Sequence, residues 1–149
     1  GYFKDVDVIA GVATAGIAQG ALVADFLDLP FCYVRPEPKK HGMGNQIEGY
    51  YEAGQKVLVI EDLISTGKSS LQVVDVLKNA GVEVVGMVSI FTYGFDIADE
   101  AFAKAGVKYQ SLTNYSNLIS LAVEKNIVSA ATESLLMDWR KDPANWQGV

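Results

Sequence analysis

The chain has 149 residues, 50% of them hydrophobic, and a formal net charge of −6 at pH 7. This length and apolar content suffice for a globular domain with its own core, and we predict one domain over residues 1–149. An acidic chain lacks the basic face on which nonspecific nucleic-acid binding depends, so we expect no nucleic-acid partner. No apolar run approaches the length of a membrane span, so we expect no association with a membrane. No signal-peptide pattern is visible and Cys32 is the one cysteine, so we predict a cytoplasmic protein without internal disulfides.

The pattern of residues 7–10 predicts a short strand. Small residues at positions 11–16 follow it, and a helical apolar pattern covers residues 17–27. Small residues allow the backbone to approach a ligand closely. They also suit an ordinary strand-to-helix turn, so both interpretations of this turn stay open.

Residues 30–35 have the pattern of a second strand, which ends at Arg35. The next segment, residues 36–49, contains two prolines and three glycines, so we predict an irregular, exposed loop of the lid type. It carries Lys39 and His41, the only histidine of the chain. We interpret it as a mobile lid whose cations close over a diphosphate; a flexible hairpin with solvated lysines is the alternative.

The most informative segment of the sequence is residues 57–70. Four apolar residues at 57–60 predict a buried parallel strand, and Glu61 and Asp62 follow at its carboxyl end, where open α/β sheets bind ligands. A Ser/Thr/Gly run then leads into a helix, whose free backbone N–H groups suit a phosphate. A P-loop also ends in Gly-Lys-Ser, but it requires a glycine where this chain has Asp62.

A sugar phosphate needs this combination of groups. Carboxylates accept hydrogen bonds from vicinal hydroxyls, and the helix N-terminus binds the phosphate. A negative pair beneath a ribose also stabilises positive charge that develops at its anomeric carbon.

Beyond this stretch, helices and strands continue to alternate. The patterns predict helices over residues 67–80, 95–105, 118–124 and 130–139, and strands over residues 82–91 and 107–112. The predicted fold class is therefore α/β, with a mainly parallel sheet flanked by helices and a long flexible lid loop.

Residues 57–70 resemble the signature of the type I phosphoribosyltransferases, which bind phosphoribosyl diphosphate. The pattern Arg35-x-x-x-Lys39-x-His41-Gly42 resembles the catalytic loop of the orotate phosphoribosyltransferase family in particular. The resemblance implies the type I phosphoribosyltransferase fold and transfer of the phosphoribosyl group to N1 of orotate, which gives orotidine monophosphate and pyrophosphate. It also implies Mg²⁺ held through the substrate, with no direct protein ligand, and a homodimer in which each lid acts on the neighbouring subunit's site.

The resemblance assigns residues to roles. It implies Lys39, His41 and Asp62 as catalytic residues, and Ser65 and Tyr93 as contacts to orotate. It implies the following as the binding set for phosphoribosyl diphosphate: Arg35, Lys39, His41, Glu61, Asp62, Leu63, Ile64, Ser65, Thr66, Gly67, Lys68 and Ser69.

Some positions depart from the family pattern. Tyr93 stands where many members place an arginine against the orotate carboxylate, Pro36 where many carry a second basic residue, and Ala15 where some carry a lysine. The family's N-terminal segment, which covers the base, is expected to be missing before Gly1, with a loss of orotate affinity. A phosphoribosyltransferase for a purine or uracil, and a noncatalytic regulator that senses phosphoribosyl diphosphate, are the alternatives.

Overall fold

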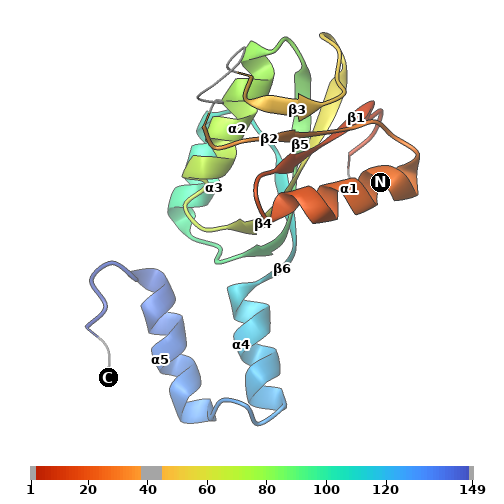
Figure 1. Ribbon diagram of the computed structural model, residues 1–149. Coiled ribbons are helices and arrows are strands. Elements are labelled where there is room, and N and C mark those ends of the chain that lie inside the picture. Colours follow the sequence, from red (N-terminus) through yellow and green to blue (C-terminus); the bar gives the residue numbers. More distant parts are fainter. Residues whose placement is uncertain (1–2, 38–44, 148–149) are drawn as a thin grey trace.

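A computed structural model describes residues 3–37 and 45–147. Within these residues six strands form one sheet in the order β3-β2-β1-β4-β5-β6 (Figure 1). The strands are β1 Val8–Val12, β2 Phe31–Val34, β3 Ile47–Gly49, β4 Lys56–Ile64, β5 Glu83–Thr92 and β6 Tyr109–Asn114. Neighbouring strands are parallel except for the antiparallel pair β2–β3, which confirms the predicted, mainly parallel sheet.

The helices of the described chain are α1 Gly16–Leu27, α2 Lys68–Asn79, α3 Asp96–Lys104, α4 Tyr115–Glu124 and α5 Ala130–Lys141. Successive side chains of β4 point to opposite faces of the sheet. Val57 and Val59 belong to a core with residues of α2 and α3, whereas Leu58 and Ile60 belong to a smaller core with residues of α1. The fold thus has a sheet between helices, with β1 and β4 at its buried centre.

Several predicted boundaries were wrong. The central strand β4 continues through Glu61 and Asp62 to Ile64, so the acidic pair lies inside the strand and not after it. Part of the predicted irregular loop forms β3, because Ile47 packs against the core and pairs with Val34. The last strand begins at Tyr109, not at position 107. The Val107 N–H instead donates a hydrogen bond to the Phe102 carbonyl at the end of α3. The next helix begins at Tyr115, because the Asn114 side chain accepts a hydrogen bond from the Asn117 N–H over 2.9 Å.

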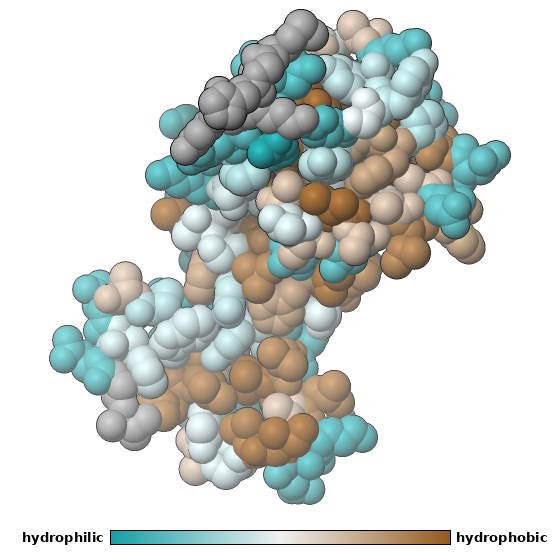
Figure 2. All heavy atoms as spheres, in the orientation of Figure 1, coloured by the Kyte–Doolittle hydropathy of each residue, from teal (hydrophilic) through white to brown (hydrophobic). Residues whose placement is uncertain are grey.

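The α4–α5 hairpin extends away from the sheet (Figure 1). Within the described chain α5 has no buried residue, and hydrophobic residues of the hairpin reach the surface (Figure 2). Trp139 anchors it, with its ring centroid 5.2 Å from that of Tyr115 and 5.7 Å from that of Tyr93. Arg140 Nη1 also donates to the Gly94 carbonyl over 2.6 Å. In the described chain no helix combines the length and apolar character that a membrane span requires.

Candidate active site

The turn between β4 and α2 presents backbone N–H groups to solvent. We call residues 63–69 the phosphate turn. Among the described residues, no side chain caps the start of α2, and its first turn has no acidic residue. Thr66, Lys68 and Ser69 are exposed. The uncapped start of α2 and the positive end of its helix dipole therefore meet at one accessible point, which suits a phosphate group.

Gly67 fixes the shape of this turn. Its φ of +78° is a conformation that side chains disfavour, and a Cβ there would lie 2.8 Å from Cε2 of Phe102. Phe102 is 1% exposed, so its ring has little room to move. The phosphate turn is therefore held against the core through α3.

Glu61 and Asp62 lie in different environments, although they are neighbours in β4. Glu61 is 4% exposed, and both of its carboxylate oxygens accept hydrogen bonds. The Asp62 N–H donates to Oε1 over 3.0 Å, and Ser70 Oγ donates to Oε2 over 2.8 Å. Asp62 is half-buried, so it is the carboxylate of the pair that can meet a ligand directly.

Burial raises the pKa of Glu61 to about 7, and the neighbouring Asp62 adds to this shift. The hydrogen bond from Ser70 acts in the opposite direction and favours the charged form. Glu61 therefore changes charge near neutral pH. A carboxyl group with so large a pKa shift, next to an accessible helix N-terminus, is typical of a functional site.

The first residue of α1 lies close to the middle of β4, just before the acidic pair. A Cβ on Gly16 would lie 2.6 Å from the Ile60 carbonyl oxygen, so only glycine allows this contact. A cavity of about 50 Å³ lies between the turn after β1, the phosphate turn and the end of β2; its lining includes Ala13, Arg35 and Ser69. The structure thus brings together three segments that the sequence analysis treated separately.

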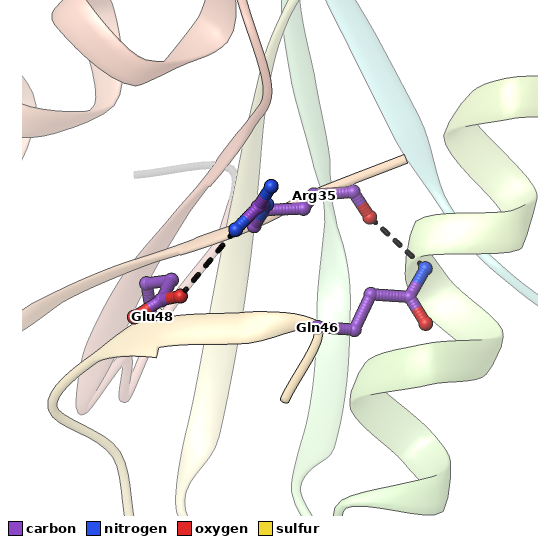
Figure 3. A network of polar contacts seen from close by, with 3 residues as sticks. All are labelled: Arg35, Gln46 and Glu48. Carbon is purple, nitrogen blue, oxygen red and sulfur yellow. Dashed lines mark hydrogen bonds and ion pairs between the residues drawn. The ribbon is translucent and has the colours of Figure 1, made fainter. Parts of the chain in front are cut away.

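Arg35 lies at the end of β2, where the predicted lid begins (Figure 3). Its Nη1 is 3.8 Å from Oε1 of Glu48, and Gln46 Nε2 donates to its carbonyl oxygen over 2.9 Å. The two ends of the lid segment are therefore joined beside the site. Lys39 and His41 lie outside the described residues.

The predicted orotate contacts, Ser65 and Tyr93, have local partners. Ser65 Oγ accepts a hydrogen bond from the Thr66 N–H over 2.6 Å. The Tyr93 ring stacks on Phe95 with centroids 5.3 Å apart and also contacts Trp139. Tyr93 therefore takes part in anchoring the hairpin.

The sequence analysis missed Ser70, the partner of Glu61. A signal was available, because Ser70 shares the buried face of α2 with Val73, Val74 and Leu77 at helical spacing. A polar residue at such a position needs an internal hydrogen-bond partner.

An uncapped helix N-terminus beside an acidic pair, on a mainly parallel sheet, is the arrangement expected of a class of proteins that bind sugar phosphates. A family model described as the phosphoribosyl transferase domain matches residues 2–126, and the chain belongs to this family. An orotate phosphoribosyltransferase of Cytophaga hutchinsonii is 51% identical over 146 residues, which are 98% of this chain and 70% of the relative. One of Bacteroides thetaiotaomicron is 54% identical over 97% of this chain and 68% of its own length. Within the family, the chain is thus an orotate phosphoribosyltransferase.

Solved structures agree with this assignment. The orotate phosphoribosyltransferase of Aeropyrum pernix is similar with a TM-score of 0.68 and 33% identity, over 81% of this chain and 65% of its own. A Mycobacterium tuberculosis orotate phosphoribosyltransferase in complex with 5-phospho-α-D-ribosyl 1-diphosphate has a TM-score of 0.62 and 27% identity, over 78% of this chain and 68% of its own. They support the predicted type I phosphoribosyltransferase fold.

Proposed function

We propose that the β4–α2 turn binds the phosphoribosyl group while it moves from phosphoribosyl diphosphate to orotate, a step of pyrimidine nucleotide (UMP) synthesis. The observation that carries this proposal is the half-buried Asp62 beside the uncapped N-terminus of α2. The products are orotidine monophosphate and pyrophosphate. A cytoplasmic location remains part of this proposal.

In the reaction, the bond from the anomeric carbon to the diphosphate oxygen breaks, and a bond from that carbon to N1 of orotate forms. The proton that N1 loses is balanced by the diphosphate that leaves. Positive charge develops on the ribose as the leaving group departs. Asp62 accepts hydrogen bonds from the ribose hydroxyls, and Glu61 adds a second, buried negative charge beneath the ring. These charges stabilise the transition state more than the bound substrate, so they act mainly on kcat.

The remaining predicted residues are proposed to bind the 5′-phosphate and the diphosphate at the two ends of phosphoribosyl diphosphate. The phosphate turn, with Leu63, Ile64, Ser65, Thr66, Gly67, Lys68 and Ser69, holds the 5′-phosphate through N–H groups and hydroxyls. Arg35, Lys39 and His41 hold the diphosphate, whose negative charge grows as it leaves. Ser65 and Tyr93 remain the proposed contacts to orotate.

Mg²⁺ is proposed as the cofactor. Among the described residues, no group of three or more His, Cys, Asp or Glu side chains could hold a metal ion. Mg²⁺ often binds mainly through substrate phosphates and water, which agrees with an ion that has no direct protein ligand. The ion would neutralise charge on the diphosphate, held mainly by the substrate itself.

The active unit is proposed to be a homodimer in which each lid acts on its neighbour's site. Asp62→Asn disables the site of its own subunit, and Lys39→Ala disables the lid supplied to the partner. A heterodimer of the two would keep one intact site, so mixing the inactive proteins should restore up to about half of one dimer's activity per heterodimer. A mixture that stays inactive despite demonstrated subunit exchange would show that the lid acts within its own subunit.

Pyrophosphate release with orotate, uracil and hypoxanthine in parallel tests the substrate assignment. We expect release with orotate to exceed release with the other bases by at least about 100-fold, because a site built for a charged group discriminates strongly against bases that lack it. Faster release with uracil or hypoxanthine would reassign the base. Binding of phosphoribosyl diphosphate without release on any of the three would favour a noncatalytic sensor.

A further inference from the structure

The first turn of α2 contains a hydroxyl that the proposed chemistry does not use. Ser70 is 1% exposed and shares its helix face with the buried Val73 and Val74. A hydroxyl on such a face has lost its hydrogen bonds to water, so it needs a partner inside the protein. That partner is Glu61, whose Oε2 lies 2.8 Å from Ser70 Oγ.

The contact connects the two halves of the site. Glu61 belongs to β4, and Ser70 belongs to the helix whose N-terminus is the proposed phosphate site. Because Asp62 donates its N–H to the other oxygen of Glu61, the carboxylate is held from its own strand and from α2. Rotation of Glu61 would break at least one of these hydrogen bonds and leave a buried polar group without a partner.

We propose that Ser70 is a positioning residue for phosphoribosyl transfer: its hydroxyl fixes the orientation of the Glu61 carboxylate beside Asp62. This inference rests on the proposed function, because it assigns Ser70 a role in that reaction. Burial opposes the ionisation of Glu61 most strongly, and the Asp62 side chain adds to this effect. The Ser70 hydroxyl from α2 and the Asp62 backbone N–H from β4 favour ionisation.

Loss of the hydroxyl should therefore act on the transition state. Ser70→Ala should lower kcat about ten-fold, while KM for phosphoribosyl diphosphate changes less than about three-fold, since Glu61 matters most when positive charge develops on the ribose. It should also raise the pKa of Glu61, so that the acidic limb of the pH profile of kcat moves to higher pH. A purely structural role would lower the amount of folded enzyme without moving this limb.

The test compares Ser70→Ala with two matched variants. Ser111→Ala breaks another internal hydroxyl pair, because Ser111 Oγ lies 2.5 Å from Oγ of the buried Ser89. Ser89 is the strand partner of Glu61, but the substitution leaves both hydrogen bonds of Glu61 in place. It should change kcat by less than about two-fold and leave the acidic limb of the pH profile of kcat at the same pH. Ser70→Thr keeps the hydroxyl and should keep the limb at its original pH. Thermal unfolding shows whether each variant is folded at the assay temperature.

A titration of the Glu61 carboxyl carbon by NMR gives a readout that does not depend on turnover. Ser70→Ala should move this titration to higher pH, and Ser111→Ala should not. An unchanged Glu61 titration in folded Ser70→Ala would overturn the inference, as would loss of kcat without a shift of the acidic limb. Asp62→Asn distinguishes failure of the proposed function from failure of the role of Ser70. Full activity of Asp62→Asn would contradict the proposed function. An inactive Asp62→Asn together with normal kcat and a normal pH profile in Ser70→Ala would reject only the role of Ser70.

Discussion

The β4–α2 turn and the α4–α5 hairpin differ most clearly in how they are held. The residues of β4 from Val57 to Glu61 are all buried, and Gly67 packs directly on the fully buried Phe102. In α5, by contrast, no described residue is buried, and Trp139 and Arg140 supply contacts to the turn after β5. The core therefore fixes the geometry of the proposed phosphate site, while a few peripheral contacts fix the hairpin.

This difference implies that substitutions in the two regions should have separable consequences. Changes at the buried residues of the β4–α2 region, Glu61 and Gly67, should affect stability and substrate handling together, because the same residues serve both. Changes in the hairpin should loosen the hairpin and leave the chemistry largely intact. Three substitutions test these expectations, in order of decreasing effect on stability.

Gly67→Ala should produce the largest loss of stability. The new methyl group must adopt a positive φ and would lie 2.8 Å from the Phe102 ring, so we expect a loss of about 3 kcal/mol in the free energy of unfolding. KM for phosphoribosyl diphosphate should rise as the phosphate turn shifts. Urea unfolding and steady-state kinetics measure both, with Gly54→Ala as the control, since Gly54 also has a positive φ but open space around it. Equal losses in the two variants would show that packing on Phe102 does not hold the turn.

Glu61→Gln should change how stability depends on pH. The pKa of Glu61 is raised to about 7 in the folded protein, so the protonated carboxyl favours folding below the unfolded pKa near 4.5, and this contribution is lost as pH rises through 7. Glutamine does not ionise. As pH rises from 5 to 8, the free energy of unfolding of the variant should therefore increase by about 2 kcal/mol relative to that of the parent, because one pKa unit corresponds to about 1.4 kcal/mol. Parallel curves of unfolding free energy against pH would show that Glu61 does not titrate in this range.

Trp139→Ala should have the smallest effect on global stability, about 1 kcal/mol, because Trp139 is half-exposed on a peripheral hairpin. Amide exchange in α4 and α5 should accelerate, while kcat stays within about two-fold. Trp146→Ala, in the tail after α5, is the matched control. If Trp139→Ala lowers kcat as strongly as a change in the phosphate turn, the hairpin supports the site through Tyr93, and the separation of the two regions fails.

The same comparison shows what could be predicted from the sequence. The strand at 57–60 and the helix after Gly67 follow local patterns and form as predicted, whereas the acidic pair lies inside β4, which continues to Ile64. Local pattern was sufficient here because a buried parallel strand and a helix N-terminus each have a strong sequence signature.

Tertiary contacts decided the rest. Residues 47–49 form β3 only because β2 offers a partner edge, and a short polar segment gives no sign of such pairing. The different environments of Glu61 and Asp62 depend on Ser70, which is nine residues away in sequence. The direction of the α4–α5 hairpin depends on how Trp139 and Arg140 meet the turn at Tyr93 and Gly94, which periodicity does not specify.

The central claim is that Asp62, beside the N-terminus of α2, carries the phosphoribosyl chemistry. The most direct test is the single-turnover rate of pyrophosphate release with orotate for Asp62→Asn and for Asp75→Asn, which removes an exposed carboxylate from the same helix region. We predict a loss of at least about 1,000-fold for Asp62→Asn at nearly unchanged stability, because the lost charge acts in the transition state, and a change below about two-fold for Asp75→Asn. A rate for Asp62→Asn within about three-fold of the parent would contradict the claim.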